Sequence, residues 1–227
     1  MITFTGIVHP PLFIPELCIT PGHTAIIGPN GSGKTTLLRM LAGFITPIEG
    51  EITIRGISGP SDSVGWVDEN PDRNILFSRV YDEISSSLRF SHLPSDEIEQ
   101  KVSGICTTWS IDHLLNRRME ELSGGEKITV ALAAATINTP EILILDEPDA
   151  HLDKILWHTI INHIKKINPD YSIVATHQME IASEADQLIY LEKGTIIHCD
   201  TPEKVFSQLK ETCYYPLLWR MRNGSQY

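Results

Sequence analysis

The residues with the clearest chemical potential form a glycine-rich loop near the start of the chain. Positions 28–35 read Gly-Pro-Asn-Gly-Ser-Gly-Lys-Thr and match the phosphate-binding pattern G-x-x-x-x-G-K-[ST] in full. Such glycines let the backbone wrap around an anion and point its N–H groups at phosphate oxygens. Lys34 is expected to reach the terminal phosphates of a nucleotide, and the Thr35 hydroxyl to coordinate Mg²⁺. The predicted phosphate-binding residues are Gly28, Pro29, Asn30, Gly31, Ser32, Gly33, Lys34, Thr35 and Thr36.

A second motif places two carboxylates after an apolar run. Residues 142–145 are continuously apolar, as in strands buried on both faces of a parallel sheet, and Asp146 and Glu147 follow directly. Open α/β sheets bind ligands at the carboxyl ends of their strands. Asp146 is therefore a candidate Mg²⁺ ligand, directly or through water. Glu147 is a candidate general base for the water that attacks a γ-phosphate. Charged turns are common after buried strands, so the prediction depends on the loop at 28–35.

A third motif is the segment Leu-Ser-Gly-Gly-Glu at 122–126, which precedes a predicted helix through about Ile137. Its hydroxyl and backbone amides suit an anion at a helix N-terminus. By itself this segment would be interpreted as a plain loop with a helix cap.

The elements that must position these motifs alternate between strands and helices. Residues 77–122 have helical patterns, and we expect a helix after residue 35 and a hairpin near 192–197. The predicted strands are 2–8, 24–27, 51–55, 64–67, 142–145, 172–176, 187–191 and 195–197. The pattern indicates one α/β domain with a mainly β first third and a helical insertion. The aromatic tail at 214–219 is expected to pack against the body.

Composition narrows the classes of ligand. The 227 residues include 18 Lys and Arg against 29 Asp and Glu, a net charge of −11. This balance disfavours general nucleic-acid binding, which depends on cationic contacts to phosphates, and unaided attachment to anionic lipid. The sequence has no signal-peptide pattern and no apolar run that approaches 18 residues, so we expect a soluble chain. Four scattered cysteines favour buried thiols over disulfides or zinc.

In order and spacing, these motifs resemble those of the nucleotide-binding subunits of ATP-binding-cassette (ABC) proteins. The resemblance rests on 28–35, 122–126, 142–148, the Ala-His-Leu-Asp string at 150–153, and His177. It implies a P-loop NTPase cassette over 1–227, with a mixed sheet core and an N-terminal antiparallel β part. A helical subdomain at about 77–122 would be inserted in the RecA-like core. It also implies ATP hydrolysis, with ATP and Mg²⁺ as cofactors.

The same resemblance implies that two subunits sandwich two ATP molecules head to tail. Ser123, Gly124 and Gly125 would then complete the γ-phosphate site of the other subunit, and Asp153 would lie in the loop at the dimer seam. His177 would contact the γ-phosphate and orient the attacking water. The implied catalytic residues are Lys34, Glu147 and His177.

The sequence departs from the family pattern at several positions. Glu69 occupies the place of a Mg²⁺-sensing glutamine, where its carboxylate would either ligate the metal or point to solvent. Glu126 replaces the glutamine that ends the 122–126 motif, and little damage is expected because the serine and glycines make the contacts. Phe4, His9 and Phe13 are all candidates for stacking on adenine.

Four short strings resemble ATPases of importers of the energy-coupling-factor type: 70–73, 76–78, 80–84 and 201–206. This likeness implies a second ABC ATPase, either an identical copy or a paralogue. It also implies an integral-membrane coupling protein and a membrane protein that captures a vitamin or metal ion. No nucleic-acid partner is expected, because the chain is acidic. The chain would lie at the cytoplasmic face of the cell membrane, held there by these partners.

Three other functions stay open at this point. One is a soluble ABC ATPase of the iron–sulfur assembly type, and another is the ATPase of a conventional ABC transporter with a different substrate. The third is a regulator that binds ATP without useful turnover, against which the complete set Lys34, Asp146, Glu147 and His177 argues.

Overall fold

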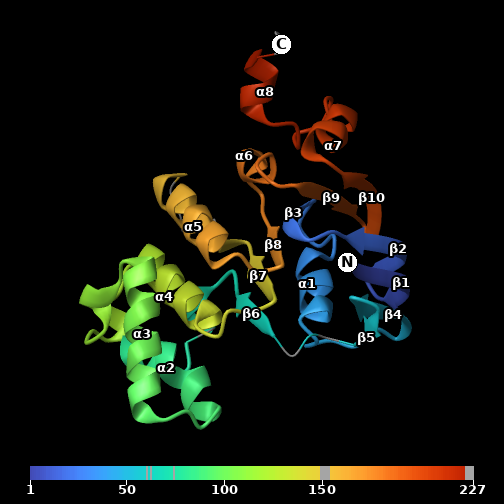
Figure 1. Ribbon diagram of the computed structural model, residues 1–227. Helices are drawn as coiled ribbons and strands as arrows, with labels where there is room; N and C mark the ends of the chain where they lie inside the picture. Colours follow the sequence, from blue (N-terminus) through green and yellow to red (C-terminus); the bar gives the residue numbers. More distant parts are fainter. Residues whose placement is uncertain (60, 62, 74, 149–153, 223–227) are drawn as a thin grey trace. The chain divides into compact units, whose positions relative to one another are not determined.

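The computed structural model describes residues 1–59, 61, 63–73, 75–148 and 154–222 (Figure 1). The chain forms two compact units, one made of Met1–Asp62 with Asp170–Tyr227 and the other of Ser63–Pro169. The first unit carries the loop at 28–35 and His177. The second carries Asp146, Glu147 and the segment 122–126. Among the helices of the described residues, none has the length and hydropathy to span a bilayer.

The first unit contains an antiparallel sheet and the strands around the phosphate loop. In the antiparallel sheet, β1 (Ile2–His9) lies between β2 (Leu12–Ile19) and β4 (Glu49–Ile54), and β4 also pairs with β5 (Ile57–Ser58). Strand β3 (Gly22–Ile27) is parallel to both β8 (Tyr171–Ala175) and β9 (Gln187–Glu192), and β10 (Thr195–Asp200) is antiparallel to β9. The predicted N-terminal antiparallel β part is confirmed.

Strand β2 is not among the strands that the sequence predicts. Pro15 lies inside it, and Pro10 and Pro11 precede it. Proline cannot donate a hydrogen bond to a neighbouring strand, which argues against a strand in the middle of a sheet. The position of β2 at the edge of its sheet removes this objection, because one side of the strand needs no partner.

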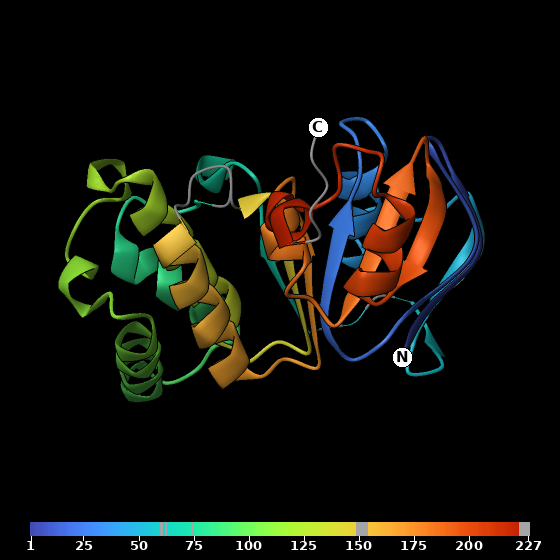
Figure 2. The same cartoon turned by 90° about the horizontal axis from the view of Figure 1, so that it is seen from above.

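The helices of the first unit are α1 (Lys34–Leu41), α6 (Met179–Ala182), α7 (Pro202–Gln208) and α8 (Leu217–Arg222). Leu37, Leu38 and Leu41 of α1 are buried at helical spacing, as their pattern predicts. Helix α7 packs against β9 and β10 (Figure 2). The Trp219 ring lies 5.3 Å from that of Phe206 and 6.2 Å from that of Tyr215, so the aromatic tail packs on its own unit.

In the part of the second unit that the structure describes, a parallel strand pair, β6 (Val64–Val67) and β7 (Ile142–Asp146), is combined with four helices. These are α2 (Val80–Phe90), α3 (Ser95–Trp109), α4 (Gly124–Thr136) and α5 (Lys154–Ile167); short 3-10 turns are η1 (Pro71–Arg73), η2 (Asp112–Leu114) and η3 (Met119–Glu121). Helix α4 packs on α2, α3 and β6. Its approach to β6 requires Gly65, because a Cβ there would lie 2.5 Å from the Ala135 carbonyl oxygen. Every residue of β7 is buried, as its apolar run predicts.

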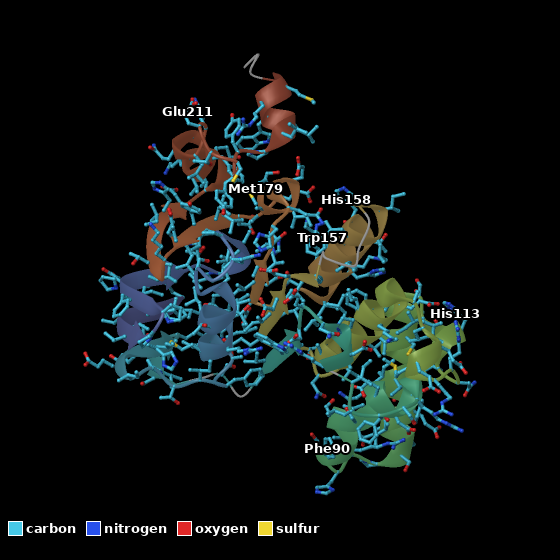
Figure 3. The ribbon with its side chains drawn as sticks, turned by 180° about the vertical axis from the view of Figure 1, so that it is seen from behind. Phe90, His113, Trp157, His158, Met179 and Glu211 are labelled. Atoms are coloured by element: carbon cyan, nitrogen blue, oxygen red, sulfur yellow. The ribbon has the colours of Figure 1, made fainter. Side chains whose placement is uncertain are left out.

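Helix α5 shows how one face is buried. Trp157 is 3% exposed, whereas the next residue, His158, is exposed (Figure 3). Ile160, Ile161 and Ile164 continue the buried face at spacings of three and four. This periodicity, rather than overall hydrophobicity, determines which side of the helix packs.

A buried carboxylate fixes the segment that enters α2. Glu83 is 5% exposed, and its Oε2 accepts the backbone N–H groups of Leu76 and Phe77, both at 2.8 Å. Burial raises the pKa of Glu83, and the two hydrogen bonds act in the opposite direction. Glu83 therefore has a structural role in addition to its place in the 80–84 string.

Candidate functional site

The phosphate-binding loop lies between β3 and α1, as the sequence predicts. Gly33 is the N-cap of α1 with φ 106°, and its carbonyl accepts the N–H of Leu37 at 2.8 Å. A Cβ on Gly28, whose φ is 152°, would lie 2.0 Å from the Leu191 carbonyl oxygen. A Cβ on Gly33 would lie 2.5 Å from Leu12 Cδ2. Glycine is thus required at both positions for two reasons: a Cβ would clash with the neighbouring residue, and the φ angle is positive.

The loop folds around its own lysine. Lys34 is 4% exposed, and its Nζ donates to the Gly28 carbonyl at 3.0 Å. The same Nζ lies 3.3 Å from Nε2 of His177, which is 143 residues away in sequence. The structure therefore brings together two of the three residues predicted to be catalytic.

Ser32 provides a specific test of whether the loop fits a phosphate. The side chain is 2% exposed, and its Oγ is buried without a hydrogen-bond partner within the described residues. An unsatisfied buried hydroxyl costs about 1–3 kcal/mol. A phosphate oxygen in the loop would accept this hydrogen bond, so the donors present fit a bound polyphosphate. Asn30 and Gly31 are exposed, and Thr35 and Thr36 are half-buried.

His177 follows β8 at its carboxyl end. The N–H of Thr176 donates to the Ile26 carbonyl at 3.1 Å, which continues the pairing with β3 up to the residue before His177. His177 is exposed and borders a cavity of about 580 Å³. Met179 and Glu211, which are labelled in Figure 3, also line this cavity. The third residue of the group, Glu147, belongs to the second unit.

Gly194 supports the phosphate loop but has no place in its motif. Lys193 (φ 47°) and Gly194 (φ 79°) form the two-residue turn between β9 and β10, the predicted hairpin. The Gly194 N–H donates to the Ser32 carbonyl at 2.9 Å, and its carbonyl accepts the N–H of Phe13 at 2.8 Å. Sequence reasoning identifies the turn, but only the long-range contacts connect it with the site.

Substituting Gly194 with alanine should destabilise the first unit by about 2 kcal/mol or more and weaken nucleotide binding. A Cβ at this position would lie 1.7 Å from the Pro11 carbonyl oxygen, so the turn must move away from Ser32. Denaturant unfolding and ATP titration would measure both effects.

Gly56→Ala is the matched control, because Gly56 has φ 80° in the turn between β4 and β5 and open space around its Cβ. Gly56→Ala should lower the free energy of unfolding by only about 1 kcal/mol, the cost of a left-handed backbone at alanine, and should leave the ATP affinity unchanged. Equal effects of the two substitutions would contradict the role assigned to Gly194.

The aromatic residues considered for base stacking differ in exposure. Phe4 is fully buried in β1 and cannot present its ring to a ligand, whereas Phe13 is 52% exposed and next to the turn at Gly194. His9 is half-buried, with Nδ1 buried and without a partner among the described residues. The candidates are thereby reduced to His9 and Phe13.

Two carboxylates of the second unit, those of Asp68 and Asp146, lie at the carboxyl ends of its two parallel strands. Asp146 is the last residue of β7 and is 2% exposed. Val67 pairs with Leu145, so Asp68 and Asp146 each follow the last paired residue of their strands. Asp68 is 8% exposed and was missed by sequence reasoning; its Oδ1 accepts the N–H of Asn70 at 3.2 Å. Glu69 is exposed.

Glu147 has a backbone conformation that is uncommon for residues other than glycine. Its φ is 50°, in the left-handed region, which costs about 1–3 kcal/mol and is frequent at functional sites. The chain turns sharply after β7, and the half-buried side chain is presented at the end of the strand.

The segment 122–126 caps α4. The backbone N–H of Glu126 donates to Ser123 Oγ at 3.3 Å, and the Ser123 N–H donates to Glu126 Oε2 at 2.8 Å. Ser123 and Gly124 are exposed, and a Cβ on Gly125 would lie 2.8 Å from Leu156 Cδ2. The predicted helix N-terminus is therefore formed at the surface, and its binding of an anion stays a prediction. Asp153 and the 150–153 string lie outside the described residues.

The sequence profile of the ABC transporter family matches residues 15–150. The chain belongs to this family. The energy-coupling factor transporter ATP-binding protein EcfA1 of Leuconostoc mesenteroides is 32% identical over 198 residues, which cover 82% of this chain and 73% of that protein. The molybdate/tungstate import ATP-binding protein WtpC of Pyrococcus horikoshii is 35% identical over 196 residues, 83% of this chain and 57% of that protein.

Among solved structures, CbiO1 of Clostridium perfringens, part of the ABC transporter complex CbiONQ, has a TM-score of 0.82 and 28% identity. The match covers 91% of this chain and 90% of that one. The cassette fold predicted from the motifs is confirmed. This ABC cassette is a transporter ATPase subunit that binds and hydrolyses ATP.

Proposed function

We propose that this ATPase drives an importer of the energy-coupling-factor type, with a metal ion or vitamin as the substrate class. The observation that carries the proposal is the 32% identity to an energy-coupling factor ATPase over 73% of its length. The likeness to CbiO1 supports it, as do the strings at 70–73, 76–78, 80–84 and 201–206. The likeness to a molybdate/tungstate ATPase favours the alternative, a conventional importer, although the chain spans only 57% of that protein.

The residues of both units have proposed roles in hydrolysis. Lys34 and the loop amides bind the β- and γ-phosphates, and Glu147 accepts a proton from the attacking water while His177 orients that water. Phosphoryl transfer is catalysed mainly by positioning and electrostatic stabilisation. The contact of Lys34 with His177 and the unpaired Ser32 hydroxyl support these roles in the first unit.

Mg²⁺ is the proposed metal cofactor, and its chemistry is to neutralise charge on the phosphates. The Thr35 hydroxyl and the Asp146 carboxylate would hold it, with Glu69 as a further ligand. All three side chains offer oxygen atoms, which are the ligands that Mg²⁺ prefers. In nucleotide-binding sites Mg²⁺ is usually held by few protein ligands together with phosphates of the substrate.

Two cassettes are needed in this mechanism. The exposed Ser123 and Gly124, with Gly125, would complete the γ-phosphate site of a second cassette, either an identical copy or a paralogue. Asp153 would lie at their seam. ATP binding then closes the pair and hydrolysis reopens it, and the helical subdomain at about 77–122 transmits the motion to an integral-membrane coupling protein. The cassette is thereby held at the cytoplasmic face of the membrane, with a substrate-capture protein in the same complex.

Glu69→Gln should accelerate hydrolysis and lower the Mg²⁺ concentration required, because the repulsion between the Glu69 charge and the phosphates is expected to exceed the contribution of this carboxylate as a metal ligand. At about 5 Å and an effective dielectric constant near 20, the repulsion between Glu69 and one phosphate charge is roughly 3 kcal/mol. Because Glu69 is exposed, screening reduces this value, and we expect a change of about three- to tenfold. ATPase rates over a Mg²⁺ titration measure this change.

Glu97→Gln, which removes the same charge from an exposed position on α3, is the control. Equal rates and Mg²⁺ dependence for Glu69→Gln and wild type would show that Glu69 points to solvent.

The proposed importer is tested by purifying the tagged protein from detergent-solubilised membranes and identifying its partners by mass spectrometry. We expect a second cassette and an integral-membrane coupling protein in a fixed ratio, and a higher ATPase rate in the complex than in the isolated subunit. A complex made only of soluble proteins would contradict the importer and favour the iron–sulfur assembly type.

A further inference from the structure

The hydroxyl proton of Ser123 is already engaged within its own chain. Ser123 Oγ donates to Glu126 Oε2 at 2.7 Å, and the same carboxylate oxygen accepts the Ser123 backbone N–H at 2.8 Å. A serine hydroxyl carries one proton, whereas an ionised carboxylate can only accept. The hydrogen bond that Ser123 could donate to a phosphate oxygen is therefore already donated to Glu126.

The surroundings keep Glu126 ionised. Hydrogen bonds from Ser123 are the largest cause that lowers the pKa of Glu126, and the charges of Arg117 and His113 act in the same direction. Arg117 Nη1 lies 3.5 Å from Glu126 Oε1, and Arg117 Nη2 donates to the Glu121 carbonyl at 2.8 Å. The carboxylate thus has a fixed orientation as well as a charge.

We propose that Glu126 is a positioning residue that restrains ATP-driven closure, because it accepts the hydrogen bond of the Ser123 hydroxyl and adds negative charge where the facing γ-phosphate must bind. This inference rests on the proposed role of Ser123, Gly124 and Gly125 in completing the site of a second cassette. It replaces the expectation that a glutamate at this position is of little consequence, which considered only the serine and the glycines.

Glutamate and glutamine at position 126 differ in how strongly they would accept the hydrogen bond of the Ser123 hydroxyl. For Ser123 to donate to a phosphate oxygen, it must give up a hydrogen bond to a charged acceptor, which is roughly twice as strong as one to a neutral acceptor. A glutamine carbonyl would still accept the Ser123 N–H and preserve the cap of α4, but it would release the hydroxyl more readily and without repelling the phosphate. The restraint therefore depends on the charge rather than on the shape of the side chain.

The test measures ATP-induced association in a Glu147→Gln background, in which turnover does not remove the bound state. Analytical sedimentation over an ATP titration measures the associated fraction of the double variant Glu126→Gln/Glu147→Gln and of the single variant Glu147→Gln. We expect the half-saturating ATP concentration to fall about tenfold in Glu126→Gln, and the difference to shrink in 1 M salt because charge effects are screened. If Glu126 had only a structural role in folding, the difference in association would not depend on salt. We expect the melting temperature of the Glu126→Gln variant to differ little from that of the protein with Glu126.

Glu121→Gln is the matched control. Glu121 also faces Arg117, at 3.8 Å, but none of the contacts described for Ser123 involves it. It should leave association unchanged. If the proteins with and without Glu126→Gln associate at the same ATP concentration, the proposed restraint by Glu126 is overturned, whereas the proposed pairing of two cassettes is retained. If both bind ATP and neither associates with an identical copy or with the second cassette purified from membranes, the proposed sandwich fails and the inference fails with it.

Discussion

Glu147→Gln is expected to lower the ATPase rate by about 10²- to 10⁴-fold and to leave an ATP-bound pair of cassettes. General-base catalysis contributes acceleration of this order, and a glutamine amide cannot accept a proton from water. The backbone at φ 50° is retained by an isosteric side chain, so folding should be unaffected. Steady-state phosphate release and size-exclusion chromatography with ATP measure the two effects.

The control for Glu147→Gln is Glu203→Gln, which removes the same charge from an exposed position in the first turn of α7. Its turnover should equal that of the wild type. Unchanged hydrolysis in Glu147→Gln would remove Glu147 from the proposed mechanism, whatever the state of association.

Lys34→Met should lower ATP affinity by roughly 30- to 1,000-fold. The ammonium makes charge-assisted hydrogen bonds to phosphates, and losing them costs about 2–4 kcal/mol in total. Methionine keeps most of the aliphatic stem, which matters because Lys34 is only 4% exposed. A buried charge costs desolvation energy, so the nucleotide-free protein should be no less stable than wild type.

Calorimetric titration with ATP and melting curves with and without ATP separate these effects. The ATP-induced rise in melting temperature should disappear in Lys34→Met, whereas the melting temperature without ATP should be maintained. Lys204→Met is the control, because the Lys204 ammonium is exposed and lies 3.0 Å from Asp200. Retained ATP affinity in Lys34→Met would refute the assignment of Lys34 to the phosphates.

The phosphate loop and the carboxylates after β7 could be predicted because their signals are local. A strand, a glycine-rich loop and a helix follow one another within about 20 residues, and the apolar run at 142–145 directly precedes Asp146. Strand β2 was missed because Pro15 conceals it, and its edge position could not be known before the sheet order. Asp68 was missed because it has no motif of its own, and its importance depends on the register of β6 with β7.

The sequence by itself determined the reaction class and predicted the residues that bind phosphate, because both inferences depend on residue types at fixed short spacing. Only the tertiary structure decided which distant groups support them. Lys34 lies next to His177, which is 143 residues away in sequence, Gly194 hydrogen-bonds to Ser32, and Glu126 accepts the hydrogen bond of the Ser123 hydroxyl. The first two contacts require β3 to pair with both β8 and β9, and the third depends on the orientation of two side chains at a helix cap. Long-range pairing and side-chain orientation leave no periodic trace in the sequence, which is why these supports became visible only in the folded chain.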